Sequence, residues 1–367
     1  MRVPCPNPIP MPALQDAPLD TLLLPFAQGA LRWPAGKVLF LRARDGWALR
    51  QHAQPAQLVC EQGYRPFATV LQQGGWRVRT EDAGDHADAG VHALVLVLPP
   101  RQRDEARALL ARAVALAAPG ATVVACQSNN EGARSGEDDL QQLAGLGGKL
   151  TKHHCRVYWT APLHGGHDTA LQQRWAQLDA PRPILDGRFR SRPGVFAWDR
   201  IDPASALLAE HLPADLAGHG ADLGAGYGYL SAELLARCPQ IAALDLFEAD
   251  ARALGLARSN LARAPASVAV GYHWHDVTAG LPVQYDVIVS NPPFHAPGRL
   301  ERPDIGRRFI AVAAQALKPG GRLYLVANRH LPYEAVLDAS FGEVSVLASR
   351  DGFKLILAVR ARATVRR

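Results

Sequence analysis

The sequence predicts an α/β protein built from two tandem domains, each a mostly parallel sheet flanked by helices. The chain has 367 residues, and about 100–200 residues per domain makes two domains the default. Short apolar runs alternate with helical patterns in both halves, which is typical of parallel strands joined by right-handed crossovers. Both halves also contain the order strand, two prolines, helix, Pro-Gly, strand, which indicates a tandem duplication.

The first half alternates short strands with one clear helix. Residues 101–117 carry apolar side chains at the period of an amphipathic helix, and Pro119 and Gly120 end it. The apolar run at residues 92–98 is continuous, as expected of a strand buried on both faces. Further strands are expected at residues 37–41, 58–60 and 121–126.

The second half shows the same alternation more regularly. Its first strand is expected to end within residues 220–223. The next four strands are expected at 241–247, 267–272, 285–290 and 322–327. Its helices are expected after the first strand, at 249–263 and around 307–317. Two last strands, at 343–348 and 353–359, are expected to pair as a hairpin.

The join between the halves is expected within residues 160–190, which contain Gly, Pro and charges without sustained periodicity. We therefore predict domains at residues 1–185 and 186–367. The copies differ where chemistry is expected, because Leu98 precedes the two prolines of the first copy and Asn291 precedes those of the second. The first copy also lacks a glycine-rich loop, so we interpret it as a degenerate domain retained for binding or folding support.

Composition excludes several classes of protein. A hydrophobic content of 48% is too high for a mostly disordered chain. No apolar run approaches the roughly 18 residues of a membrane-spanning helix, and the proline-rich start lacks the apolar region of a secretory signal. The 5 cysteines are scattered singly, which fits reduced thiols in the cytosol and predicts no metal site.

The charge balance favours a polyanionic partner. The net charge is +6, and Arg greatly outnumbers Lys; Arg binds phosphate with two parallel hydrogen bonds. Codon bias in a GC-rich genome is the simpler explanation of the Arg excess, so the charge supports a nucleic-acid partner without establishing one. Arg188, Arg190 and Arg192 alternate at strand spacing, so they form either a phosphate-binding edge or a solvated one.

A glycine-rich loop opens the second domain's site. Asp222, Gly224, Ala225, Gly226 and Gly228 lie between a predicted strand and a helix. Glycines allow a sharp turn and a close approach to a ligand, and the helix N-terminus offers free N–H groups. The sequence therefore predicts a Rossmann-like domain with a nucleotide or nucleoside cofactor.

Two acidic residues follow the next strands. Glu248 lies 20 residues beyond Gly228, at the end of the second strand, where a carboxylate can hold both ribose hydroxyls. Asp276 follows the third strand. Since the carboxyl ends of parallel strands meet at one edge of a sheet, we expect both to line the same crevice as the glycine loop.

The motif Asn291, Pro292, Pro293, Phe294 follows the fourth strand. The prolines fix the backbone and remove two donors, so that carbonyl acceptors remain, and Asn291 is held extended because it precedes a proline. An asparagine oxygen and a proline carbonyl form a pair of acceptors, which suits the two hydrogens of a planar exocyclic amine. Phe294 offers a flat apolar face for the attached ring.

These motifs together resemble the class I S-adenosylmethionine (SAM)-dependent methyltransferases that modify amino groups. NPPF followed by His295, and the later stretch LKPGGRLYLVANRHLPYEAVLDASFG, resemble the bacterial ribosomal RNA guanine-N2 methyltransferases of the RsmC and RlmG type. The resemblance spans residues 194–361 and extends more weakly into the first domain through NNEGARSGEDDL. It implies two tandem methyltransferase-like domains, of which only the second is catalytic.

The resemblance also implies roles for the site residues. The loop from Asp222 to Gly228 is expected to contact SAM, Glu248 its ribose, and Asp276 its adenine. Asn291 is expected to contact both cofactor and target amine, with Pro292, Pro293 and Phe294 completing the catalytic motif. Residues 195–202 resemble the family element before the first strand, but Ala197 or Trp198 stands where Ser is more usual, so a role of Asp202 in the cofactor site is left open.

The predicted function is therefore methyl transfer from SAM to the exocyclic N2 amine of a guanine in 16S ribosomal RNA. The alternatives are a guanine-N2 methyltransferase of 23S ribosomal RNA, a protein-glutamine N-methyltransferase, a DNA adenine methyltransferase and a noncatalytic RNA-binding ribosome assembly factor. We expect a cytoplasmic monomer that binds ribosomal RNA or the small ribosomal subunit, with no metal and no membrane contact.

Overall fold

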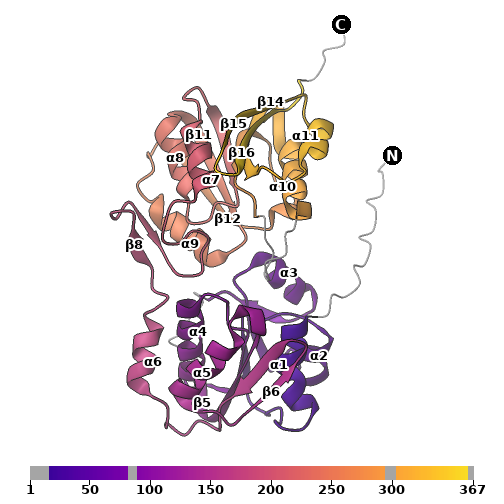
Figure 1. Cartoon of the computed structure of the whole chain (residues 1–367), viewed down its shortest axis with the longest axis vertical. Coiled ribbons are helices and arrows are strands. Elements are labelled where there is room, and N and C mark those ends of the chain that lie inside the picture. Colours follow the sequence, from indigo (N-terminus) through magenta and orange to yellow (C-terminus); the bar gives the residue numbers. More distant parts are fainter. Residues whose placement is uncertain (1–15, 82–88, 294–302, 363–367) are drawn as a thin grey trace.

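The protein, seen in a computed structural model, is described for residues 16–81, 89–293 and 303–362, so Phe294 lies outside the described residues. Figure 1 shows two α/β domains placed end to end, the first in indigo to magenta and the second in orange to yellow. No helix within the described ranges is both long and apolar enough to cross a bilayer.

The two sheets share one topology. Each has seven strands, in the orders β3-β2-β1-β4-β5-β7-β6 and β12-β11-β10-β13-β14-β16-β15. In both sheets the first five strands in this order are parallel to one another, and the sixth, β7 or β16, pairs antiparallel with both of its neighbours. The predicted fold class is therefore confirmed, and the matching strand orders agree with a tandem duplication.

The elements of the first domain begin close to the N-terminus. Its strands are β1 (Val38–Leu41), β2 (Leu58–Glu61), β3 (Arg77–Arg79), β4 (His92–Val97), β5 (Ala117–Ser128), β6 (Gly148–Lys152) and β7 (Cys155–Trp159). Its helices are α1 (Ala17–Ala27), α2 (Trp47–His52), α3 (Arg65–Gln73), α4 (Arg103–Leu116), α5 (Ala133–Ala144), α6 (Thr169–Ala176) and the short η2 (Asn129–Glu131).

The elements of the second domain follow a short hairpin of β8 (Arg182–Ile184) and β9 (Phe189–Ser191). Its strands are β10 (Ala217–Leu223), β11 (Gln240–Glu248), β12 (Ala269–Trp274), β13 (Tyr285–Ser290), β14 (Leu317–Asn328), β15 (Glu343–Arg350) and β16 (Phe353–Val359). Its helices are α7 (Pro203–Glu210), α8 (Tyr229–Arg237), α9 (Ala251–Asn260), α10 (Pro303–Ala316), α11 (Glu334–Ser340) and the short η3 (Val277–Ala279).

Continuous apolar strands are buried on both faces, as the sequence predicts. In β1, Val38 and Phe40 belong to one core cluster and Leu39 and Leu41 to another. Side chains alternate across a strand, so one apolar run serves the helices on both sides of the sheet.

Two strands begin earlier than the sequence predicts. β5 and β14 start directly after their helices, at Ala117 and Leu317, and the Pro-Gly stretch lies within each strand. In the second domain Tyr285 pairs with Leu317 and Val287 with Arg322, so residues 318–321 form an irregularity in the ladder. The Pro-Gly signal therefore marks a bulge rather than the start of the strand.

The expected join contains regular structure that its composition conceals. α6 begins at Thr169, where the Asp168 side chain accepts a hydrogen bond from the Leu171 N–H at 2.8 Å. The hairpin β8–β9 follows and spans the predicted domain boundary. These elements are too short to show a period, and the boundary after residue 185 stays a prediction.

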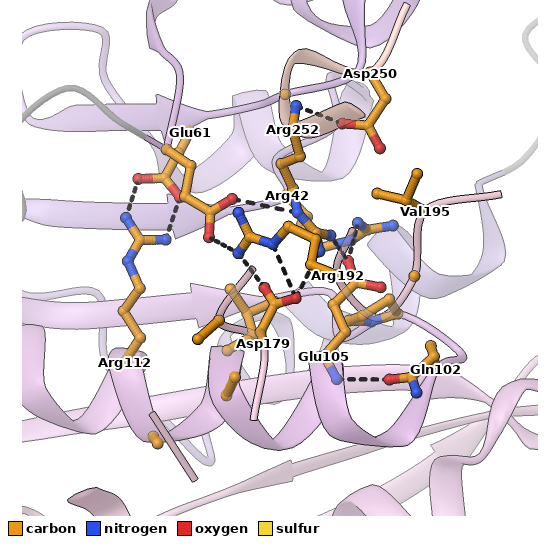
Figure 2. A pocket seen from close by; sticks show the side chains of 18 of the residues that line it. Arg42, Glu61, Gln102, Glu105, Arg112, Asp179, Arg192, Val195, Asp250 and Arg252 are labelled. Carbon is orange, nitrogen blue, oxygen red and sulfur yellow. Dashed lines mark hydrogen bonds and ion pairs between the residues drawn. The ribbon is translucent and has the colours of Figure 1, made fainter. Parts of the chain in front are cut away.

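A buried ion-pair network joins the two domains. Arg252 in α9 pairs with Glu105 in α4 and with Asp179, whose carboxylate lies 2.8 Å from Arg252 Nη2. The side chains of Arg252, Glu105 and Asp179 are only 11%, 8% and 9% exposed. Figure 2 shows these charges converging, with Arg192 also on Asp179 and Arg42 within 3.2 Å of Glu105.

We predict that Arg252→Ala lowers the free energy of unfolding by about 3 kcal/mol, because each of two buried carboxylates loses one of its arginine partners. Arg258→Ala is the matched control, since Arg258 lies on the exposed side of the same helix and is expected to cost under about 1 kcal/mol. Urea denaturation of the full chain measures both. Equal losses in the two variants would contradict the structural role of the network.

Candidate active site

The glycine loop turns sharply between β10 and α8. Gly224, Gly226 and Gly228 have φ values of 78°, 55° and 91°, a region that side chains with a Cβ rarely adopt. A Cβ on Gly228 would also lie 3.2 Å from Ala257. Ala225 is buried within the loop, and the free N–H groups at the start of α8 follow directly.

Asp222 supports this loop from the end of β10. It is fully buried, and its Oδ2 accepts a hydrogen bond of 2.7 Å from the Ser231 hydroxyl in α8. Its Oδ1 has no partner among the described residues. Burial raises the pKa of Asp222 to about 7. The hydrogen bond from Ser231 ties β10 to α8.

Glu248 links the loop to the next crossover. Its Oε2 accepts a hydrogen bond from the Gly226 N–H and its Oε1 one from the Asp250 N–H, both at 2.8 Å. Burial raises the pKa of Glu248 to about 7 despite these bonds. The carboxylate is thus held at the carboxyl end of β11, against the glycine loop.

Asp276 lies beyond β12 and caps η3. Its Oδ1 accepts hydrogen bonds from the Thr278 N–H at 2.9 Å and from the Thr278 hydroxyl at 2.7 Å. The neighbouring His275 N–H donates to the Glu248 carbonyl at 2.9 Å. The acidic ends of β11 and β12 are therefore adjacent, as the strand order predicts.

The Asn291 side chain is fixed by α7. Its Nδ2 donates to Asp202 Oδ2 and to Ser205 Oγ, each at 2.9 Å. Its Oδ1 is buried and has no hydrogen-bond partner among the described residues. A carboxylate only accepts, so the nitrogen must face Asp202 and the oxygen must face the other way. The result is an oriented, unsatisfied acceptor, which is costly unless a ligand completes it.

The Asn-Pro-Pro motif lies beside the glycine loop. Ser290 pairs in register with Leu223, and its hydroxyl donates to the Leu223 carbonyl at 2.8 Å. A Cβ on Gly224 would lie 3.9 Å from the Asn291 carbonyl oxygen. Pro292 is buried and Pro293 is exposed. The expected role of Phe294 falls outside the described residues.

A cavity of about 1300 Å³ lies between the domains and reaches Pro293. Tyr64 and Phe67 line it from the first domain and Phe196 from the segment before α7. Most of the charged groups labelled in Figure 2 are paired with one another across this space. The cavity thus combines aromatic surface with neutralised charge.

The Arg188, Arg190 and Arg192 side chains are engaged within the protein. Arg188 pairs with Glu233, Arg192 pairs with Asp179, and Arg190 Nη2 donates to the Pro181 carbonyl at 2.8 Å. They hold the hairpin against its surroundings, and these contacts compete with phosphate binding.

The histidines in and directly after β12 contact other parts of the protein. His273 Nε2 lies 2.9 Å from Asp245 Oδ1, and His275 Nε2 lies 2.6 Å from the Gly280 carbonyl. Within the described ranges, no group of three or more His, Cys, Asp or Glu is placed to hold a metal ion.

Sequence reasoning missed two residues that orient Asn291. Asp202 followed by Pro203 is a recognisable helix start, and the Asp202 carboxylate does cap α7 by accepting from the Ser205 N–H at 2.8 Å. That signal predicts the helix but not its contact with Asn291. Ser205 carries no separate signal in the sequence.

The comparisons with known proteins cover both domains. A family model described as methyltransferase small domain matches residues 186–357. The ribosomal RNA small subunit methyltransferase C of Erwinia tasmaniensis is 30% identical over 299 residues, which cover 78% of this chain and 84% of that protein. The protein of the same name from Salmonella typhimurium is 29% identical over 343 residues, which cover 90% of this chain and 97% of that protein.

A solved structure resembles the whole chain. It is the T. thermophilus 16S rRNA N2 G1207 methyltransferase (RsmC) in complex with AdoMet and guanosine, which is 26% identical. It superposes with a TM-score of 0.77 over 94% of this chain and 92% of that one.

We predict that SAM affinity falls about tenfold between about pH 8 and about pH 6, because the ionised Glu248 accepts hydrogen bonds better than the acid. The raised pKa places protonation in this window, with the weaker-binding form at low pH. Glu248→Gln is expected to bind weakly and without pH dependence. Calorimetric titration checks this, and a slope persisting in Glu248→Gln would assign the titration elsewhere, for example to Asp222.

Proposed function

Because the chain belongs to the ribosomal RNA small subunit methyltransferase C family, we propose that it transfers a methyl group from SAM to the exocyclic N2 amine of a guanine in 16S ribosomal RNA. The observation that carries the proposal is the buried Asn291 Oδ1, which is oriented by Asp202 and left without a partner among the described residues.

The residues at the edge of the second sheet suit an adenosine-containing cofactor. The loop from Gly224 to Gly228 offers backbone N–H groups and space for close approach. Glu248 is placed to hold the ribose hydroxyls, and Asp276 lies beside it for the adenine. When bound, SAM supplies an electrophilic methyl group.

The Asn-Pro-Pro motif prepares the amine. The guanine N2 lone pair is delocalised into the ring, so the free amine is a poor nucleophile. Asn291 Oδ1 and the Pro292 carbonyl accept its two hydrogens, which favours a pyramidal nitrogen and stabilises the positive charge that develops on it. The methylated amine then loses its proton readily, so the chain needs no strong base. Phe294 is proposed to stack on the base, which must leave its helix to enter the site.

The proposal extends to partners and location. Ribosomal RNA or the small subunit is the macromolecular partner, which places the protein in the cytoplasm, and we propose that it acts as a monomer. Labelled methyl transfer, run in parallel on small subunits, large subunits, naked ribosomal RNA and release factors, tests the substrate. Labelling of large subunits or release factors alone would overturn the proposal.

We predict that Asn291→Ala lowers the rate of methyl transfer by about 10²–10³-fold, the scale of losing one preorganised electrostatic contact. SAM affinity is expected to remain close to that of the native chain. Single-turnover transfer and calorimetry measure the two effects. Asn130→Ala, which removes an exposed asparagine in the first domain, is the control, and native turnover in Asn291→Ala would refute the role.

We predict that Asp202→Ala releases the Asn291 amide and lowers methyl transfer nearly as much as Asn291→Ala. The double variant is expected to be little worse than either single variant, because both act through one contact. Asp168→Ala is the matched control, since it removes a helix cap of the same kind from α6 at a cost of about 1 kcal/mol. Additive losses in the double variant would show that Asp202 acts independently.

A further inference from the structure

The glycine loop of the second domain carries one large side chain, that of Tyr227, between Gly226 and Gly228. The flanking glycines have φ values of 55° and 91°, so the backbone turns sharply on both sides of this residue. Tyr227 is only 4% exposed, and its ring packs edge-on against that of Phe189 in β9, with centroids 5.6 Å apart. The ring is therefore part of the core, and its buried hydroxyl requires a polar partner.

The Tyr227 hydroxyl has such a partner outside the loop. It donates a hydrogen bond to the Arg200 carbonyl at 3.1 Å. Burial, with a smaller contribution from the nearby Asp202 carboxylate, raises the pKa of Tyr227 to about 12. The phenol therefore keeps its proton at neutral pH and remains a donor to this carbonyl.

The Arg200 carbonyl belongs to the turn that leads into α7. The Arg200 N–H donates to the Ala197 carbonyl at 3.2 Å, and Ala197 has a φ of 49°, which is costly for a residue with a Cβ. Two residues after Arg200, the Asp202 carboxylate caps α7 and accepts from Asn291 Nδ2 at 2.9 Å. The Tyr227 hydroxyl thus holds a strained turn directly before the carboxylate that orients Asn291.

The backbone of Tyr227 is held in place by other contacts. Asn260 Nδ2 donates to the Tyr227 carbonyl at 2.8 Å and to the Arg190 carbonyl at 2.9 Å, while Asn260 Oδ1 accepts from the Arg190 N–H at 2.7 Å. On the preceding residue, the Gly226 N–H donates to Glu248 at 2.8 Å. Because the backbone is fixed from α9, β9 and β11, the hydroxyl is a donor of defined position.

We propose that Tyr227 is a positioning residue, whose hydroxyl ties the cofactor loop to the turn before Asp202 and thereby helps to set the direction of the Asn291 amide. This inference rests on the proposed function, since it requires that Asn291 accept the target amine beside SAM. Methyl transfer depends on the alignment of donor and acceptor, and small displacements are costly. A single side chain that contacts both parts of the site maintains that alignment.

The test uses Tyr227→Phe in the full chain, because this variant keeps the buried ring and removes only the hydroxyl. The single-turnover rate of methyl transfer at saturating SAM is expected to fall about three- to tenfold, the scale of one intramolecular hydrogen bond. The dissociation constant of SAM, measured by calorimetry, is expected to stay close to that of the native chain. Guanosine binding to the chain loaded with S-adenosylhomocysteine is expected to weaken, which reports on the amine site without turnover.

The matched control is Tyr272→Phe, which removes a hydroxyl of the second domain that has no hydrogen-bond partner within the described part of the chain, where its ring lies 4.6 Å from the Arg258 guanidinium. This control is expected to leave all three measurements unchanged. In an Asn291→Ala background, Tyr227→Phe is expected to cause no further loss of rate, because both act through one contact.

A native rate in Tyr227→Phe would overturn the inference. So would an equal loss of rate in the Asn291→Ala background, or a weakening of SAM binding with guanosine binding unchanged, since either result would place the effect of the hydroxyl away from Asn291. If the native chain transfers no methyl group to any of the ribosomal RNA substrates, the proposed function fails instead.

Discussion

The chemistry of the site depends on one hydrogen-bonded contact, the donation of the Asn291 amide nitrogen to Asp202 and Ser205. The amide side chain has two N–H donors and one oxygen acceptor. Because a carboxylate can only accept, the amide nitrogen must face Asp202. Once the nitrogen is engaged, the oxygen must face away as a buried acceptor. An unpaired buried acceptor is unfavourable, and that cost favours a ligand which donates hydrogens there. An exocyclic amine has two hydrogens, one for this oxygen and one for the Pro292 carbonyl, whereas a hydroxyl has only one.

The sequence predicted those parts of the site that lie on consecutive strands. The glycine loop, Glu248 and Asp276 each follow a strand, and parallel order alone brings them to one edge. Asn291 was found because two prolines restrict its backbone locally. Asp202 contacts Asn291 across 89 positions of sequence, and Tyr64 pairs with Asp250 from another domain. Such contacts are determined by packing between elements, and neither residue carries a local pattern that predicts its contact.

The early starts of β5 and β14 were missed for a related reason, since a Pro-Gly pair predicts a turn but not that strand pairing resumes on both sides of it.

The duplicated domain illustrates how a site is lost while its scaffold is kept. The strand order is unchanged, so every loop of the first domain still ends at the same edge of its sheet. Leu98 stands where Asn291 stands in the second copy, and the carboxylate of Glu61 is neutralised by Arg112. A paired, buried carboxylate has little capacity left for ribose hydroxyls. What remains is a sheet with an apolar core on both faces and a loop after β2 that contacts the second domain.

The ion-pair network and the loop contact act on the same short stretch of chain. Asp250 pairs with Tyr64 through the backbone, and its side chain accepts from the Arg252 N–H at 2.9 Å at the start of α9. The Arg252 side chain then reaches Glu105 and Asp179. Both contacts begin within four residues of Glu248, so any motion of one domain against the other must displace the backbone beside the Glu248 carboxylate. The backbone that follows Glu248 is for this reason held by both domains and not by the second sheet alone.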